Sequence, residues 1–431
     1  MKYFSIVILL LITSKITAQN EETVLWINEN LIEIEDANPY TKLEIFDSNI
    51  PKKFQKAKIF GFGEATHDGK EFFNIKAKFF KYLVENHKVK TFIMEESFPA
   101  ESGINEWISG GEGDIETIAS NFSLRPWHTE EIVSLLKWMR DYNIDKPKGA
   151  QIQFYGMDIQ IVEGINLKIR DFVNKYNLPV SEKLLSVIDS CTNKKVDYQN
   201  PTNWADIQLP KLKKIGNIIK EDQNFSNSKQ HEKLTSVIRA LNYLQKYTYY
   251  IQHPKSEVRD QKMFENVKWI VNNKTKNGKA FIWAHNEHIN NKEISPAGSG
   301  WISVGGHLKE FYGDEYYSVY FDFGKGKSIG YVTKRNKPNY WDIFEIEKPL
   351  RKSYAETLIE SDTDIYFIDM HSIENDVAKN FFGNPKKQLF LGGAGYDPKS
   401  KKSSIIKKNY LEICDGLIFV KNISVPNYTW R

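Results

Sequence analysis

Acidic and imidazole side chains follow several apolar segments of the chain at the points where those segments end. The first such segment ends at Gly63 and is followed by Glu64 and, three residues later, by His67. A carboxylate at this spacing can orient and polarise an imidazole, which is what a general base requires. We therefore predict that Glu64 and His67 form a catalytic pair.

Three further apolar segments end in side chains that can take part in the same chemistry. These side chains are Glu95, Asp158, His285 and His288. Open α/β sheets bind ligands at the carboxyl ends of their strands, so we expect these groups to converge with Glu64 and His67 on one sheet edge. A carboxylate buried directly after an apolar strand is costly unless it is paired, so at least one of Glu95 and Glu96 is expected to face a polar cleft.

Short runs rich in β-branched and aromatic residues predict the strands that position these groups. The predicted strands are Ala57 to Gly63, Lys90 to Glu95, Gln151 to Gly156, Lys279 to His285, Tyr316 to Phe323, Asp364 to Asp369, Gln388 to Leu391 and Gly416 to Val420. Helical patterns separate most of these runs, and a βαβ rhythm is typical of a parallel sheet covered by helices. The sequence thus predicts an α/β fold with three layers, α/β/α, around a mostly parallel sheet.

One long region lacks strand patterns altogether. Between Ile161 and Asn273 the apolar residues recur at helical spacing, which predicts several consecutive helices and a mainly helical insertion over residues 161–273. Because no linker rich in proline, glycine and serine brackets this region, we favour a cap packed on the sheet over a separate domain.

Composition excludes several classes of protein. The chain has 431 residues, and 59 Lys and Arg against 55 Asp and Glu give a net charge of +4, which argues against nucleic-acid binding by charge. With 41% hydrophobic residues the chain can bury a large core, so it is not a disordered protein. Apart from the N-terminus, no apolar stretch is long enough to span a bilayer, so no stable membrane insertion is expected. The oligomeric state does not follow from the sequence.

The N-terminal residues 1–18 are typical of a secretory signal. Lys2 precedes an apolar run from Phe4 to Ile12, and the segment ends on Ala18. We predict a periplasmic or secreted protein whose single domain covers residues 19–431. Such a compartment permits a disulfide between Cys191 and Cys414 but does not require one, and two buried free cysteines are the alternative.

Several strings of residues resemble the erythromycin esterase family, hydrolases that open macrolide lactones. The matching strings are Gly63-Glu64-x-x-His67, Thr129-Glu130-Glu131-Ile132, Phe154-Tyr155-Gly156-Met157-Asp158, Arg259-Asp260 and Trp283-Ala284-His285-Asn286-x-His288. The resemblance covers nearly the whole chain after residue 18, and the strings are far more specific together than singly. It implies a hydrolase of a carboxylic ester or macrocyclic lactone that needs no metal and no cofactor, with macrolide inactivation as one role.

The resemblance also implies roles for individual residues. His67 would activate water without a covalent intermediate, and Glu64 would set its orientation and basicity. His285 and His288 would position the substrate and polarise its carbonyl group, with Glu95 nearby.

Three more residues are expected to bind substrate. Arg259 matches a family arginine, although a structural ion pair with Glu257 or Asp260 is the alternative, and Asp158 ends its matching string. Related esterases often carry arginine nine residues after the motif histidine, where this chain has Lys76. Lysine keeps the charge but lacks the two-pronged donor geometry of arginine.

Two alternatives to this hypothesis remain at this stage. The first is a metal-dependent hydrolase, since carboxylates and imidazoles such as Glu64, Glu95 and His285 are acceptable ligands for Zn or Mn. The second is a secreted binding protein whose cleft is walled by aromatic side chains. The candidate wall residues are Trp127, Trp283 and Trp301. A serine hydrolase is poorly supported because the chain contains no GxSxG string.

Overall fold

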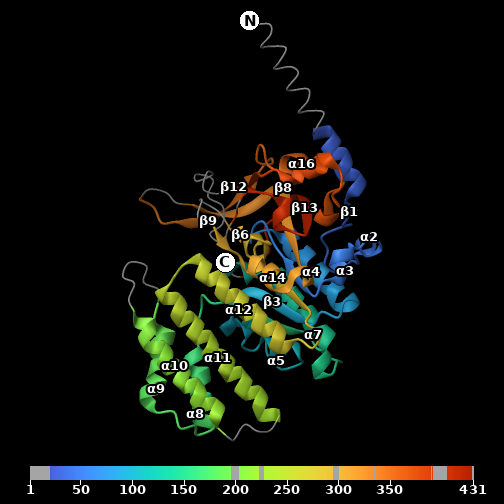
Figure 1. Ribbon diagram of the computed structural model, residues 1–431. Coiled ribbons are helices and arrows are strands. Elements are labelled where there is room, and N and C mark those ends of the chain that lie inside the picture. The colour runs from blue at the N-terminus through green and yellow to red at the C-terminus, as the bar shows by residue number, and fades with distance from the viewer. Residues whose placement is uncertain are drawn as a thin grey trace, which may run out of the picture. The chain divides into compact units, whose positions relative to one another are not determined.

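The computed structural model describes residues 20–195, 203–222, 228–294, 300–332, 336–389, 391 and 405–429. The predicted secretory signal lies outside these ranges. The chain forms two compact units (Figure 1). The first consists of Met1–Phe92, Pro126–Met139 and Thr275–Arg431, and the second of Ile93–Arg125 and Arg140–Lys274.

The first unit is built on a mixed sheet. Its strands, in spatial order, are β1 (Ile32–Glu33), β10 (Ile365–Asp369), β13 (Gly416–Ile423), β8 (Tyr316–Val332), β2 (Ile59–Phe62) and β5 (Ala280–Trp283), and β9 (Tyr340–Ile346) pairs with β8. The four central strands run parallel to one another: β13 pairs with β8, β8 with β2, and β2 with β5. The pairings of β1, β10 and β9 are antiparallel.

The register of the central strands decides where the candidate site forms. Phe62, the last residue of β2, is the Cα partner of Trp283, the last residue of β5, and also of Val319 in β8. All residues of β2 and β5 are buried, as expected for strands covered on both faces. The residues that follow β2 and β5 therefore leave the sheet side by side at one edge.

Helices and short strands complete the first unit. The helices are α2 (Glu44–Ser48), α3 (Lys52–Lys56), α4 (Lys70–Asn86), α13 (Asn286–Ile289), α14 (Val304–Tyr312), α15 (Ala355–Leu358), α16 (Asp376–Gly383), α17 (Tyr410–Ile413) and most of α7 (Glu130–Asn143). Two small antiparallel sheets pair β6 (Glu293–Ile294) with β7 (Trp301–Ile302) and β11 (Lys386–Leu389) with β12 (Ile405–Lys408).

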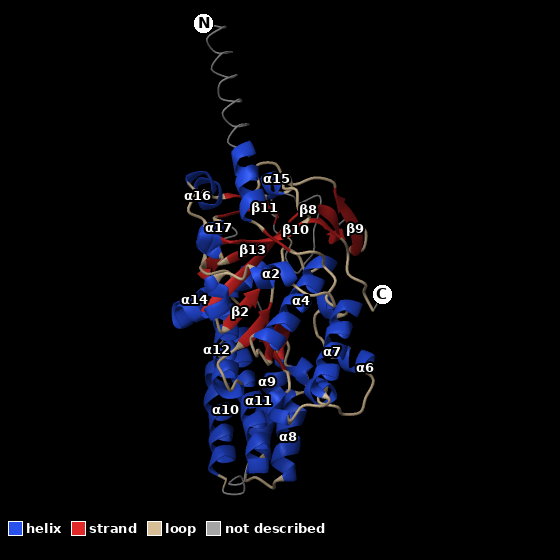
Figure 2. Cartoon of the chain, turned by 90° about the vertical axis from the view of Figure 1, so that its right-hand side faces the viewer, coloured by secondary structure: helices blue, strands red, loops and turns tan. Residues whose placement is uncertain are grey.

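The second unit is mainly helical. It holds β4 (Gln153–Asp158) and most of β3 (Thr91–Ser97), which are neighbours in the sheet order, together with α5 (Ile104–Ile108), α6 (Ile115–Ala119), α8 (Ile165–Lys175), α9 (Glu182–Asn193), α10 (Trp204–Glu221), α11 (Ser228–Gln252) and α12 (Ser256–Lys274). The long helices α8 to α11 pack against one another (Figure 2) around an apolar core that includes Ile188, Leu212 and Leu244.

Most of the predicted architecture is observed. Each predicted strand is present, and the predicted α/β class with a mostly parallel sheet and surrounding helices is confirmed. Two details differ. The segment predicted over Gln388 to Leu391 forms β11 in a separate small sheet, and β10 runs antiparallel to β13. Helices occupy most of the region 161–273, as predicted. The second compact unit, which contains this region, begins earlier, at Ile93, and the role of the region as a cap stays a prediction.

Both cysteines are buried and carry free thiols. Burial raises the pKa of Cys191 to about 11, and burial also raises the pKa of Cys414 well above its usual value. The structure thus agrees with two buried side chains rather than with a disulfide. None of the helices within the described ranges is both long and apolar enough to cross a bilayer.

Asp322 in β8 makes the stability of the fold depend on pH. It is buried, and its carboxyl accepts hydrogen bonds from the Tyr410 hydroxyl at 2.6 Å and the Phe323 amide at 2.8 Å. Burial raises its pKa from 3.8 to about 6. The folded state therefore holds this proton to higher pH than the unfolded chain does, so the contribution of Asp322 to stability falls between about pH 4 and pH 6.

Replacing Asp322 by Asn is expected to remove that fall. The free energy of unfolding of the wild type should drop by about 3 kcal/mol more than that of Asp322→Asn as the pH rises from 4 to 7, because one pKa unit corresponds to about 1.4 kcal/mol. Urea denaturation at several pH values measures both curves. Parallel curves for the two proteins would contradict the prediction.

Candidate active site

Glu64 and His67 lie in the turn that follows β2. Glu64 is fully buried and His67 is 7% exposed. One carboxylate oxygen of Glu64, Oε1, forms a hydrogen bond with Nδ1 of His67. This contact assigns the proton of a neutral His67 ring to Nδ1, because a carboxylate can only accept. The other ring nitrogen, Nε2, is then the basic one.

Lys76 neutralises the second oxygen of the same carboxylate. It lies in α4, is fully buried, and donates from Nζ to Oε2 of Glu64. The ammonium also lies 4.0 Å from the ring centroid of Trp283, at the end of β5. Both oxygens of Glu64 are thus engaged, one by an imidazole and one by a cation. The predicted contact of Lys76 with substrate stays a prediction.

His285 faces this pair from the end of β5. It is the N-cap residue of α13, and its Nδ1 accepts a hydrogen bond from the backbone amide of Glu287 at 3.2 Å. A neutral His285 therefore carries its proton on Nε2 and is a donor there. The ring centroids of His67 and His285 are 5.1 Å apart, and Trp127 lies edge-on to His67 at 5.3 Å.

Asn286 joins the two turns and fixes α13 to the sheet. Its backbone amide donates to the carbonyl of Glu64 at 3.0 Å. Its side chain donates to the carbonyl of Phe321 at 2.7 Å and accepts from the amide of Phe321 at 3.0 Å. No role was predicted for Asn286 itself, although its place between the two motif histidines is a signal for one. His288, two residues further along the chain, is half-buried, and its role in substrate positioning stays a prediction.

Gly63 must be glycine for these turns to meet. A Cβ atom at Gly63 would lie 2.2 Å from Oδ1 and 3.1 Å from Cα of Asn286. We expect Gly63→Ala to lower the free energy of unfolding by about 1–3 kcal/mol, since overpacking forces neighbours to shift. Gly216→Ala is the control, because its Cβ meets only a flexible methyl of Leu241 at 3.2 Å. Urea denaturation compares the two, and equal stability would contradict the prediction.

A second cluster of predicted site residues lies in the second unit. Arg259 in α12 donates to both carboxylate oxygens of Asp158 at 2.9 and 2.7 Å and to Glu95 at 3.0 Å. Arg259 thus forms ion pairs with Asp158 and Glu95. Although burial opposes it, the carboxylate of Asp158 together with that of Glu95 raises the pKa of Arg259 well above its usual value.

Glu96 is buried beside this second cluster and is satisfied within the protein. Its carboxylate accepts from the amides of Ser97 at 2.5 Å and Ser123 at 2.9 Å. Burial raises the pKa of Glu96 to about 7. Seven of the predicted site residues therefore lie in two separate groups: Glu64, His67, Lys76 and His285 in the first unit, and Glu95, Asp158 and Arg259 in the second. Their convergence on one edge stays a prediction.

The metal-dependent alternative needs several ligand side chains gathered around His67. Within the ranges that the structure describes, no group of three or more His, Cys, Asp or Glu side chains is arranged to hold a metal ion. Glu64, the strongest candidate ligand, already accepts the ammonium of Lys76. Trp127 and Trp283 are at most 1% exposed, so they pack inside the protein rather than wall an open cleft.

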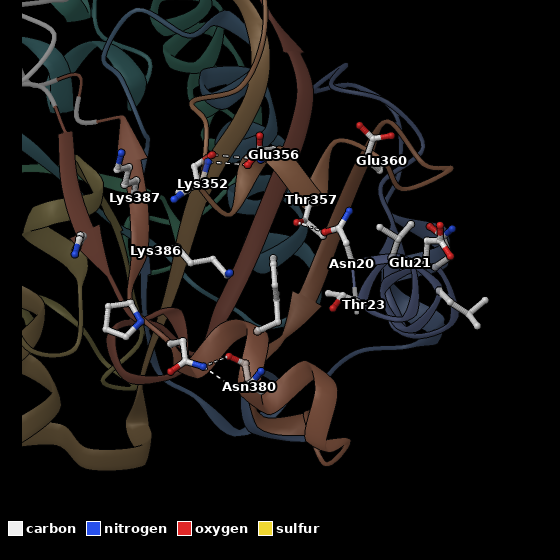
Figure 3. Close-up of a pocket in the computed structure, with 18 residues that line it drawn as sticks. Asn20, Glu21, Thr23, Lys352, Glu356, Thr357, Glu360, Asn380, Lys386 and Lys387 are labelled. Carbon is white, nitrogen blue, oxygen red and sulfur yellow. Dashed lines mark hydrogen bonds between the residues drawn. The ribbon is translucent and has the colours of Figure 1, made fainter. Parts of the chain in front are cut away.

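A separate cavity of about 1170 Å³ lies elsewhere in the first unit (Figure 3). Its wall includes Asn20, Thr357, Asn380 and Lys386, and Thr357 donates to Asn20 at 2.6 Å. None of the predicted site residues lines it. Its lining mixes lysines with glutamates and amides and does not indicate one class of ligand.

Comparison with known proteins identifies relatives over most of the chain. The family model described as erythromycin esterase matches residues 84–423. Erythromycin esterase type II of Escherichia coli is 23% identical over 386 residues, which cover 82% of this chain and 90% of that protein.

Solved structures share the fold. The crystal structure of a Bacillus cereus protein has a TM-score of 0.79 at 20% identity and covers 95% of this chain and 99% of its own. The structure of a histidine-to-asparagine variant of the erythromycin esterase EreC, in its open conformation, has a TM-score of 0.65 at 16% identity. The match covers 91% of this chain and 97% of the EreC chain. At these identities the structures establish the fold alone.

Proposed function

Because this chain belongs to the erythromycin esterase family, a family of hydrolases, we propose that it hydrolyses a carboxylic ester or a macrocyclic lactone, with macrolides among the candidate substrates. In this proposal His67 activates the attacking water and no covalent intermediate forms. Glu95, Asp158, Arg259 and His288 are proposed to bind the substrate. We also propose that residues 1–18 export the protein to the periplasm or the medium.

The main support for the proposal is the hydrogen bond between the carboxylate of Glu64 and Nδ1 of His67. The contact orients the ring and makes Nε2 the basic nitrogen, which in this proposal takes a proton from water, as general-base catalysis requires. The negative charge of Glu64 stabilises the imidazolium that forms, and Lys76 keeps the buried carboxylate compensated.

His285 supplies the complementary donor. In this proposal its Nε2–H stabilises the negative charge that develops on the carbonyl oxygen when the water oxygen adds to the carbonyl carbon, and the accepting role of Nδ1 and the 5.1 Å between the rings of His285 and His67 support it. The tetrahedral intermediate then collapses, the bond from carbon to the leaving oxygen breaks, and His67 returns its proton to that oxygen. The products are a carboxylic acid and an alcohol, or one hydroxy acid from a lactone.

Hydrolysis of a panel of macrolides, simple lactones and aryl esters tests the proposal. We expect mass spectrometry to detect addition of one water to at least one compound, and His67→Ala to lower kcat by about 100-fold to 10,000-fold. His253→Ala is the control, because His253 follows α11 in the second unit and its ring lies tilted against Tyr249, with the centroids 4.6 Å apart.

Three results would contradict the proposal. The first is no turnover of any compound by the wild type. The second is full activity in His67→Ala. If, in addition, only substitutions of aromatic side chains changed the affinity for a ligand, a binding protein would be favoured. The third is activity that a chelator abolishes and added Zn or Mn restores, which would favour the metal-dependent alternative.

A further inference from the structure

The carboxylate of Glu287 lies in a buried polar network next to His285. Its Oε1 accepts from the hydroxyl of Tyr320 at 2.6 Å, and its Oε2 accepts from Nζ of Lys408 at 2.6 Å. The side chains of Glu287 and Lys408 are each only 6% exposed. The hydroxyl of Tyr320 also lies 3.3 Å from the amide oxygen of Gln388. Because both oxygens are engaged by the protein, Glu287 is not placed to react with a substrate.

The backbone of Glu287 belongs to the turn that holds His285. Its amide donates to Nδ1 of His285 at 3.2 Å, and its carbonyl accepts from the side chain of Asn290 at 2.8 Å. The side chain of Glu287 therefore ties this short turn to two distant strands, through Tyr320 of β8 and Lys408 of β12. A helix of four residues has little stability of its own, so these ties fix its geometry.

We propose that Glu287, held by Lys408 and Tyr320, is a positioning residue that keeps His285 in the orientation and tautomer in which Nε2 carries the proton. This inference rests on the proposed function, in which that proton is donated to the carbonyl oxygen. Loss of the anchor lets the turn shift, and the Glu287 amide then no longer aims at Nδ1 of His285. The interaction lost is one made in the transition state, so kcat falls and KM does not.

Removing only one partner of the buried pair is expected to destabilise the protein, since it leaves an uncompensated charge. The test therefore uses the double variant Glu287→Gln/Lys408→Met, which removes both charges and keeps a side chain of similar size at each position. Lys407→Met is the matched control, because Lys407 is the next residue along β12 but is exposed. Urea denaturation establishes that the variants fold.

Two readouts separate positioning from a merely structural role. In protein labelled with ¹⁵N-histidine, NMR assigns the tautomer of His285, which we expect to be protonated on Nε2 in the wild type and to become a mixture in the double variant. On a substrate found in the panel, we expect kcat of the double variant to fall about 100-fold with KM unchanged, the size of effect that a small misplacement produces. Lys407→Met should match the wild type in both readouts.

A folded double variant that keeps the wild-type tautomer of His285 and the wild-type kcat would overturn the positioning role. The two hypotheses fail differently. If no ester is turned over, the proposed function fails, while the NMR measurement still decides whether Glu287 sets the state of His285. If the tautomer does not respond but His67→Ala is inactive, the positioning role fails and the hydrolase remains.

Discussion

Replacing Glu64 by Gln is expected to lower kcat of the folded protein by about 10,000-fold. The reason lies in the two partners of the side chain. Lys76 can only donate, so the single amide oxygen of Gln must turn toward Lys76. The amide NH₂ then faces Nδ1 of His67 and donates to it, which places the proton of a neutral His67 on Nε2. In that tautomer His67 cannot accept a proton from water, the defect that follows the equivalent change in a Ser-His-Asp triad.

Steady-state kinetics on the compound turned over by the wild type measures this effect. Glu315→Gln is the control, since Glu315 is exposed and pairs with Lys58 at 2.5 Å. NMR of ¹⁵N-labelled histidine should report the change of His67 tautomer directly. A loss smaller than about tenfold would show that the carboxylate does not set the basic nitrogen of His67, which would contradict the role of His67 as the general base.

Lys76→Met is expected to lower the free energy of unfolding by about 3–5 kcal/mol. Both Lys76 and Glu64 are fully buried, so removal of the ammonium leaves the carboxylate without its counter-charge in a site shielded from water. Methionine keeps much of the length of the side chain, so the loss of charge is the main change.

Urea denaturation of Lys76→Met, alone and combined with Glu64→Gln, measures the effect. The double variant should recover part of the loss because it contains no unpaired buried charge. Lys53→Met is the control, since Lys53 pairs with Asp314 at 3.5 Å on the surface and should change stability by less than about 1 kcal/mol. An equally small effect of Lys76→Met would mean that solvent reaches Glu64.

The central strands and the candidate catalytic residues at their carboxyl ends were predictable from the sequence, because both follow from the local pattern of apolar and polar residues. Apolar runs predicted β2 and β5, and the polar side chains that follow these runs were those of Glu64, His67 and His285. The parallel register of β2 and β5 places these turns side by side, which a βαβ rhythm already implies.

The contacts that depend on tertiary packing were not predictable. Lys408 reaches Glu287 from a strand 121 residues away, and no local pattern marks that lysine as buried. The bond between Lys76 and Glu64 depends on how α4 packs after the turn, and the bonds of Arg259 with Asp158 depend on the packing of α12 against β4. β10 lies between β1 and β13 and pairs antiparallel with both, yet it has the same continuous apolar run as the parallel strands, so its direction was also hidden.

A single-turnover reaction in H₂¹⁸O, with enzyme in excess over a substrate identified in the panel, tests the central claim most directly. If His67 activates water for direct attack, the carboxylic acid formed in the first turnover carries one ¹⁸O atom, the mass of the protein never increases, and His67→Ala forms no product on the same timescale. A protein carrying a covalently bound acyl group during the reaction, or unlabelled acid in the first turnover, would contradict the account.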